Sequence, residues 1–271
     1  MPVVPVFHPR REARAAVKRG YPRGAASVRL CRSLEGVERL LFRRLVDAVV
    51  LDVKAPPAPA PPTRSAPRQP PPAAAALGLP ARFPRIPMFA LSAFRSDDGA
   101  LLISCHAAGF AGILVEGVDN AVAGECIAAR TAQVARREAL RDGPQLLRLT
   151  DRLQLAAWTE VLRCAGAPTR AADVARALRV SREHLSREFA AGGAPNLKRV
   201  IDLARTACAA DLLGNPGYTV RHVVKILGYA SPGHLAGAAR RVAGATLREL
   251  GEVGPQGVLA RFLRGRTRSR V

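Results

Sequence analysis

The sequence predicts two domains of different fold class, an α/β domain with a parallel sheet followed by an all-α domain. In the first half of the 271 residues, short apolar runs alternate with amphipathic helical segments, which is typical of strands joined by helical crossovers. After Asp142-Gly143-Pro144 the strand signal ends and only helical patterns follow. We therefore expect an α/β domain over residues 1–142, a helical domain over residues 145–252, and a basic C-terminal helix or tail over residues 253–271.

Five short apolar runs predict the strands of the first domain, because each has the length and composition of a buried strand. Amphipathic segments over residues 11–20, 34–45 and 120–140 predict helices between or after them. Strands that are separated by single helices favour a parallel, doubly wound sheet. The predicted strands span residues 3–7, 27–31, 48–53, 88–93 and 112–117.

A proline-rich segment, residues 55–85, interrupts this pattern. Its proline density excludes helix and strand and favours an extended, polyproline-like chain. We interpret the segment as an exposed insertion within the α/β domain. The alternative interpretation is that it separates two independent units.

The charge of the chain predicts a polyanionic partner. The formal net charge is +21 at pH 7, far more than solubility requires, and nucleic acid is the first candidate. The excess is mostly arginine, which also fits a genome rich in G and C. The five cysteines show no spacing typical of a zinc site or a disulfide framework. No apolar run approaches the roughly 18 residues of a membrane span, so we expect a cytoplasmic protein without a membrane partner.

The helical domain begins with a pair of short helices joined by a turn. Thr169 is placed to cap a helix that runs through Leu178, and Ser181 is placed to cap a second helix, because each hydroxyl can accept from free first-turn amides. Ala175 lies where the two helices would cross closely. The apolar positions have the spacing of a shared core: Val174, Leu178, Val180, Leu185 and Phe189.

A long helix over residues 195–213 separates this pair from a second, similar pair. At 1.5 Å per residue, its roughly 18 residues span about 27 Å, close to the roughly 34 Å between successive major-groove faces of B-DNA. Thr219 is placed to cap the next helix, Gly228 to turn the chain, and Ser231 or Pro232 to begin the last helix of the pair. The domain is thus predicted to contain two helix-turn-helix units joined by a linker helix.

These residues resemble the DNA-binding domain of the AraC/XylS-type transcription regulators. The pattern continues without a gap from Ala175 to Leu213 and then resumes in the second unit. The resemblance implies that the exposed face of each second helix, the recognition helix, contacts base edges. The residues that carry it are Ala175, Leu178, Ser181, Leu185, Ser186, Arg187, Phe189, Arg205, Ala209, Leu212, Leu213, Val220, Gly228, Tyr229 and Ser231.

In the first unit, the resemblance assigns base contacts to Arg182, Glu183, Ser186 and Arg187. Arg187 is the strongest candidate, because a guanidinium can donate two hydrogen bonds to guanine O6 and N7. Its alternative role is a phosphate contact or a solvated helix face. Arg179 replaces the glycine that the family has in the turn, and a left-handed conformation there would cost about 1–2 kcal/mol.

The second unit departs from the family at its reading positions. Pro232, Gly233, His234 and Gly237 stand where long polar side chains are usual, so only His234 could read a base. Two further departures are apolar, Ala239 in place of phenylalanine and Val224 in place of a small residue. We therefore expect the first unit to read sequence and the second mainly to hold the phosphate backbone, through Arg221, Lys225, Arg240 and Arg241.

The first domain resembles, more weakly, a response-regulator receiver domain. Asp52 follows the third predicted strand, where receivers carry a phosphoacceptor aspartate, and Ser92 takes the place of their hydroxyl residue. The acidic pair that would hold Mg²⁺ for phosphoryl transfer is replaced by Phe7-His8, and the expected lysine by Glu116. We therefore expect that Asp52 is not phosphorylated, and that this degenerate receiver-like domain serves in dimerisation or protein docking.

Together these patterns predict a DNA-binding transcription regulator without cofactor or metal. Its expected partners are double-stranded DNA, RNA polymerase, and a second copy of the chain through the N-terminal domain. One alternative is an architectural DNA-binding protein with little sequence preference. Another is an enzyme acting through the N-terminal domain, but no nucleotide-binding glycine loop, serine-hydrolase elbow or HExxH motif is present, so we do not expect an enzyme.

Overall fold

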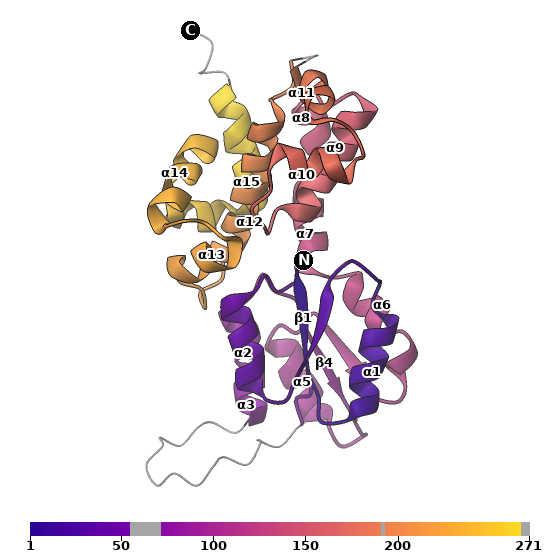
Figure 1. Ribbon diagram of the computed structural model, residues 1–271. Coiled ribbons are helices and arrows are strands. Elements are labelled where there is room, and N and C mark those ends of the chain that lie inside the picture. Colours follow the sequence, from indigo (N-terminus) through magenta and orange to yellow (C-terminus); the bar gives the residue numbers. More distant parts are fainter. Residues whose placement is uncertain (55–71, 191–192, 267–271) are drawn as a thin grey trace. The chain divides into compact units, whose positions relative to one another are not determined.

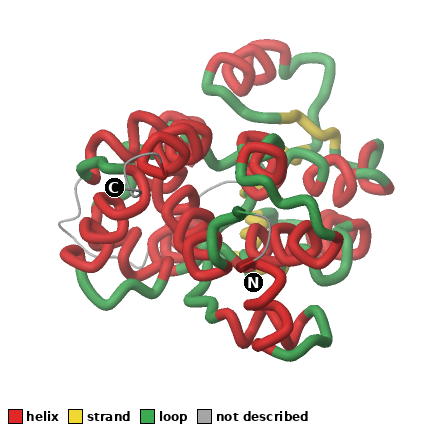
Figure 2. Tube along the Cα trace, turned by 90° about the horizontal axis from the view of Figure 1, so that it is seen from above, coloured by secondary structure: helices red, strands yellow, loops and turns green. Residues whose placement is uncertain are grey.

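The computed structural model describes residues 1–54, 72–190 and 193–266 of the chain (Figure 1). The chain divides into two compact units, Met1–Val134 and Ala135–Val271. All strands of the described residues lie in the first unit, whereas the regular structure described in the second unit is helical (Figure 2). The predicted succession of an α/β fold and an all-α fold is therefore confirmed.

The first unit is built on a five-stranded parallel sheet with the strand order β2-β1-β3-β4-β5. This order is one of the two common doubly wound arrangements, and it agrees with the receiver-like fold expected from the sequence. Each predicted strand is present, and the observed strands are shorter than predicted by at most two residues at either end. The strands are β1 (Val3–Phe7), β2 (Ser27–Cys31), β3 (Val49–Leu51), β4 (Met88–Ser92) and β5 (Gly112–Val115).

Helices cover the sheet on both faces, with α1 (Arg11–Gly20) and α6 (Ala123–Ala128) on one side and α2 (Leu34–Arg43) on the other (Figure 1). The core under α1 and α6 joins strand residues such as Val6 and Phe89 to apolar helix residues. Burying these side chains is the main stabilising contribution to such a layer. The unit also contains α5 (Gly99–Ala107) and the 3-10 turn η1 (Asp119–Ala121).

Residues 120–140 do not form the single helix that the sequence predicts. The chain breaks after α6 and starts again as α7 (Ala132–Ala139). The break has a clear cause, because Thr131 Oγ1 and Asp47 Oδ1 accept hydrogen bonds from amides in the first turn of α7, at 3.2 and 2.7 Å. These acceptors cap a new helix. Since Asp47 lies far away in sequence, the periodicity of the segment gave no sign of it.

The prediction that residues 55–85 contain no helix is wrong for its last part. Two short helices, α3 (Pro72–Leu77) and α4 (Leu79–Arg82), precede β4. A run of alanines has high helix propensity, and a proline in the first helical turn removes no intrahelical hydrogen bond. Phe83, which follows α4, is fully buried. Residues 55–71 lie outside the described part of the chain.

The second unit surrounds the linker helix α12 (Leu197–Leu213), most of whose residues are buried. α12 packs mainly against the C-terminal helix α15 (Leu247–Arg266), which is kinked at Gly254, the residue before Pro255. The remaining helices are α8 (Gly143–Leu146), α9 (Arg152–Cys164), α10 (Ala171–Ala177), α11 (Arg182–Ala190), α13 (Val220–Leu227) and α14 (Pro232–Ala243).

Candidate nucleic-acid interface and strand-end site

The first helix-turn-helix unit consists of α10 and α11, supported by α9. Val174, Leu185 and Phe189 of the predicted core are buried, while Leu178 and Val180 are half-buried. Ser181 caps α11 as predicted, since its Oγ accepts from the amide of His184 at 3.0 Å. The local sequence therefore determines where the recognition helix begins.

Thr169 does not cap α10, contrary to the prediction. Its hydroxyl instead donates to backbone oxygens near the end of α9, those of Cys164 and Ala167. The N-terminus of α10 is capped instead by Asp173, whose carboxylate accepts a hydrogen bond from the amide of Arg170 at 2.9 Å. The Thr169 hydroxyl is used to end the preceding helix, so it is not available to begin the next one.

Arg179 adopts the left-handed conformation that its place in the turn leads us to expect, with φ of 57°. It lies between α10 and α11, where the amide of Val180 donates to the carbonyl of Ala175 at 3.0 Å. A side chain in this conformation is strained by about 1–2 kcal/mol. The turn of the first unit therefore keeps its geometry without glycine.

The predicted base-contacting residues of the first unit all lie on one helix. Arg182, Glu183, Ser186 and Arg187 are exposed on α11, on the side away from the buried Leu185. The spacing of these positions places them on one face of a helix. The structure thus presents two arginines and two other polar side chains together to solvent.

The second helix-turn-helix unit is α13 and α14, and its predicted caps are present. Thr219 Oγ1 accepts from the amide of His222, and Ser231 Oγ accepts from the amide of His234 at 3.1 Å. Gly228 has the left-handed φ of 64° that turns the chain. The predicted contact residues of this unit are all exposed: Arg221, Lys225, His234, Arg240 and Arg241.

The face of α14 that would read bases carries smaller side chains than the corresponding face of α11. A Cβ atom at Gly237 would meet Nη1 of Arg241 at 3.3 Å, so the arginine side chain lies over the bare glycine. Beside it is a hollow of about 180 Å³ lined by His234, Arg241 and the linker-helix residues Asp202 and Arg205, among others. The second recognition helix thus offers one short aromatic side chain and a folded-back arginine at its reading positions.

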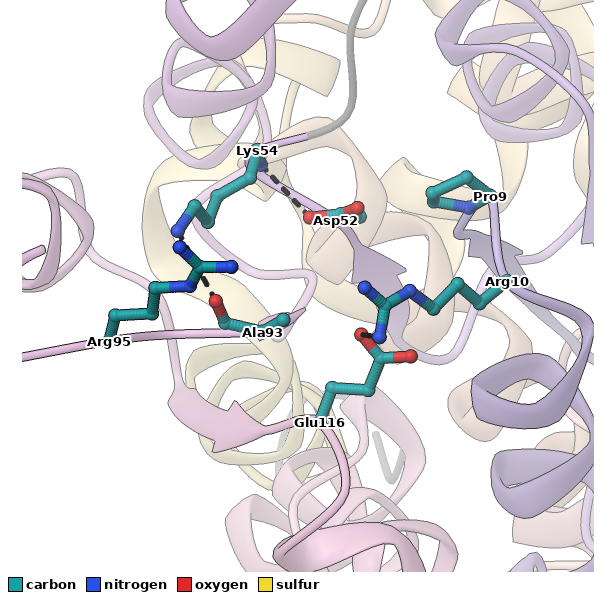
Figure 3. A pocket seen from close by; sticks show the side chains of 7 residues that line it. All are labelled: Pro9, Arg10, Asp52, Lys54, Ala93, Arg95 and Glu116. Carbon is teal, nitrogen blue, oxygen red and sulfur yellow. Dashed lines mark hydrogen bonds and ion pairs between the residues drawn. The ribbon is translucent and has the colours of Figure 1, made fainter.

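A second polar cluster lies at the carboxyl ends of the parallel strands in the first unit. His8, Asp52, Ser92 and Glu116 follow or end β1, β3, β4 and β5, and in a parallel sheet these ends meet at one edge. Asp52 and Glu116 line a hollow of about 230 Å³, whose rim carries three cations (Figure 3). The rim cations are Arg10, Lys54 and Arg95.

Asp52 is held from within the protein. It is only 8% exposed, and its Oδ1 accepts from Ser92 Oγ at 2.5 Å and from the amide of Lys54 at 2.9 Å. The Ser92 hydroxyl, which is fully buried, also accepts from the amide of Val53 at 3.1 Å. The carboxylate that would receive a phosphoryl group in a receiver is therefore bound to the neighbouring strand end.

His8 fills the space between the two carboxylates of this cluster. Its Nε2 lies 3.9 Å from Asp52 Oδ2 and 3.7 Å from Glu116 Oε2, and it is buried without a hydrogen-bond partner. Nδ1 accepts from the amide of Arg10 at 3.0 Å, so the neutral ring carries its proton on Nε2. Burial lowers the pKa of His8, and the charges of Asp52 and Glu116 oppose that shift.

This arrangement does not fit the Mg²⁺ ion that a receiver-like fold implies. Mg²⁺ demands octahedral oxygen donors and waters, whereas an imidazole nitrogen stands between the two carboxylates here. Glu116 is also paired with Arg10, whose Nη1 lies 3.3 Å from Oε2. Within the described residues no group of three or more histidine, cysteine, aspartate or glutamate side chains is arranged to hold a metal ion.

We predict that His8 makes the first unit less stable at mildly acidic pH. Because the folded-state pKa of His8 is lowered, the unfolded chain binds a proton more readily below the ordinary histidine pKa of about 6.5. The free energy of unfolding therefore falls as the pH drops below that value. Urea unfolding at about pH 7.5 and about pH 5.5 should show a larger loss for wild type than for His8→Gln, which cannot take up the proton. A larger loss for the variant would contradict this.

Comparison with known proteins identifies the helical region. Residues 174–252 match a family model described as a helix-turn-helix domain. They form an AraC-type helix-turn-helix domain. The full-length FixJ of B. japonicum is structurally similar over 89% of this chain and 96% of its own, at 13% sequence identity and a TM-score of 0.37. No curated protein matches the chain, and no helix of the described residues is long and apolar enough to cross a membrane.

The AraC-type domain is supported by a residue that sequence reasoning missed. Gln154 of α9 is 3% exposed, and its Nε2 donates to the backbone oxygen of Glu188 in the recognition helix α11 at 2.7 Å. Its Oε1 accepts from the amides of Thr150 and Asp151. The capping pattern Asp151-x-x-Gln154 was readable from the sequence, but the contact with α11 depends on the tertiary fold.

Two apolar residues that depart from the expected pattern lie within the second helix-turn-helix unit. Ala239 is fully buried in α14, and Val224 is half-buried in α13. The turn between these helices is held from the linker helix by Arg205, whose guanidinium stacks on Tyr229 at 4.4 Å and donates to the carbonyl of Leu227 at 2.9 Å. The second unit therefore retains an ordered scaffold although its reading face is reduced.

Proposed function

We propose that the chain is a sequence-specific transcription regulator in which the first helix-turn-helix unit reads bases and the second holds the phosphate backbone. An AraC-type domain supports the broader statement, a DNA-binding transcription regulator. The observation that carries the finer one is the difference between the exposed faces of α11 and α14. The first presents Arg182, Glu183, Ser186 and Arg187, whereas the corresponding positions of the second are glycine, proline and one histidine.

The first unit has the chemistry and the rigidity of a reader. A guanidinium can donate two hydrogen bonds to guanine in the major groove, and such a pair discriminates by about 1–3 kcal/mol. Arg187 is exposed for this contact, next to Ser186. Gln154 fixes the recognition helix through the carbonyl of Glu188, which limits the alternative orientations of the reading side chains.

The second unit has the chemistry of a backbone clamp. Its two helices carry four exposed cations, Arg221, Lys225, Arg240 and Arg241. Phosphate contacts fix position without carrying sequence information. Arg241 lies over Gly237 and so covers a reading position. His234 remains the single side chain of this helix that we assign to a base.

We predict that Arg187→Ala removes most of the sequence preference, whereas Gly237→Arg leaves it nearly unchanged. The first substitution deletes a bidentate base contact worth about 1–3 kcal/mol. The second adds a cation on a helix that contributes mainly phosphate contacts. The measurement is competition binding at fixed salt between a selected operator and random-sequence DNA.

The same competition assay distinguishes a sequence-specific regulator from an architectural DNA-binding protein. Specific binding should exceed non-specific binding by about 10³ or more. A wild-type ratio near one would favour an architectural protein, and an unchanged ratio in Arg187→Ala would assign base reading elsewhere.

We further propose that the N-terminal unit acts without phosphorylation, as a dimerisation or docking module, and that the DNA-bound regulator contacts RNA polymerase. The support is the buried hydrogen bonding of Asp52 and the position of His8 between two carboxylates. Treatment with acetyl phosphate and Mg²⁺ should leave the intact mass unchanged, and a labile adduct on Asp52 would overturn the first point. Sedimentation of the full chain tests dimerisation, and co-purification with polymerase tests the last point.

A further inference from the structure

Three cations surround a hollow at the end of α1 in the N-terminal unit. Lys18 and Arg19 belong to the last turn of the helix, and Arg23 belongs to the turn that follows it. With Ala15 and Tyr21 they line a hollow of about 350 Å³ that contains no acidic side chain. We call Lys18, Arg19 and Arg23 the α1 cluster.

The backbone keeps the α1 cluster together. Tyr21 is 5% exposed, and its amide donates to the carbonyl of Val17 at 3.1 Å, so the chain is anchored directly after the helix. Gly24 has a positive φ of 81°, which turns the chain just beyond Arg23. Arg23 therefore stays beside the last helical turn.

Within the described part of the chain, no ion pair neutralises the charges of the α1 cluster. All three side chains are exposed, and among the described residues no acidic group lies within ion-pair distance of them. Some other cations of this unit are paired, for example Lys54 with Asp98 and Arg82 with Glu38. Cations in the last turn of a helix interact favourably with the helix dipole, which accounts for Lys18 and Arg19 but not for Arg23, outside the helix.

We propose that the α1 cluster is a second DNA contact, which binds the phosphate backbone of the DNA held by the AraC-type domain. This inference rests on the proposed function. Covalent linkage to a DNA-binding domain gives the cluster a high effective concentration of phosphate, so contacts that are weak alone become significant. Three cations around an acid-free hollow complement a polyanion. Because phosphate contacts carry no sequence information, the cluster raises affinity and salt dependence, not specificity.

The test is the salt dependence of binding by the full chain to one long duplex. The variant Lys18→Ala/Arg19→Ala/Arg23→Ala should lower the slope of log K against log salt by about 0.9 for each phosphate that the protein no longer neutralises. The expected decrease is therefore between about 1 and 3, with the ratio of specific to non-specific binding unchanged. A control variant, Arg32→Ala/Arg43→Ala/Arg44→Ala, removes the same charge from exposed positions, one of them also in the last turn of a helix.

Each outcome decides the proposal. A larger slope change in the α1 variant than in the control, with equal thermal stability, supports it. Equal slopes in the two variants overturn it. If polyglutamate binds to the α1 cluster and the α1 variant has an unchanged salt slope for DNA, the proposal is overturned in favour of an acidic protein partner. If the wild-type chain does not bind DNA, the proposed function itself is wrong. If the wild-type chain binds DNA but the α1 variant has the same salt slope as wild type, only the α1-cluster proposal is wrong.

Discussion

Replacing Asp211 by asparagine should lower the free energy of unfolding of the C-terminal unit by about 3–5 kcal/mol, because it removes the negative charge that pairs with a buried guanidinium. Arg136 is 6% exposed, and its Nε and Nη2 donate to Asp211 Oδ2 at 3.2 and 2.9 Å. The pair joins α7 to the linker helix α12. Trp158, the one tryptophan of the chain, is buried in this unit, so its fluorescence during urea unfolding reports the change.

An exposed ion pair nearby provides the matched control. Arg141 and Glu138 are each 67% exposed and lie 2.8 Å apart, and such surface pairs contribute about 0–1 kcal/mol. Glu138→Gln should therefore barely shift the tryptophan transition. The double variant Arg136→Met/Asp211→Leu should lose less stability than Asp211→Asn, since it removes both charges. If Asp211→Asn and Glu138→Gln lower the free energy of unfolding equally, the burial of the Arg136–Asp211 pair does not contribute to stability.

Gly124→Ala should destabilise the N-terminal unit by on the order of 3 kcal/mol, because there is no room for a methyl group between α1 and α6. A Cβ at Gly124 would lie 2.1 Å from the carbonyl carbon of Gly20 and 2.4 Å from the amide nitrogen of Tyr21. These are backbone atoms, which cannot turn aside as a flexible side chain can. The two helices would have to move apart and expose part of the core beneath them.

Circular dichroism and tryptophan fluorescence together show which unit the Gly124→Ala substitution destabilises. Far-UV circular dichroism should show an earlier thermal transition in Gly124→Ala, while the fluorescence of Trp158 in the other unit keeps its midpoint. Gly99→Ala is the control, because nothing lies within 4 Å of a Cβ at that position, and alanine is favoured over glycine in helices by up to about 1 kcal/mol. Equal stability of the two variants would contradict the close approach of α1 and α6.

The sheet of the N-terminal unit was predictable because buried parallel strands are continuous apolar runs. Where the sequence misled, a distant residue or a local propensity was decisive. Asp47 contributes to ending the helical run near Thr131, and the alanines of residues 72–77 form a helix in spite of the neighbouring prolines. Neither effect follows from hydrophobic periodicity.

The candidate sites were predictable to the extent that they depend on local sequence. Ser181, Thr219 and Ser231 act as helix caps as expected, because capping needs only neighbouring residues. The contact of Gln154 with α11 and the position of His8 between two carboxylates both require residues that are far apart in sequence. Position on a helix face could thus be predicted, whereas tertiary support could not.

The most direct test of the division between the two helix-turn-helix units is a base-resolved footprint on a selected operator. Base-methylation and phosphate-ethylation interference, measured with wild type and with Arg187→Ala, separate base contacts from backbone contacts. We predict one block of strong base interference in the major groove, which disappears in Arg187→Ala, next to a second groove segment with phosphate interference alone or with a single weak base. Two blocks of equally strong base interference, one for each unit, would contradict the account.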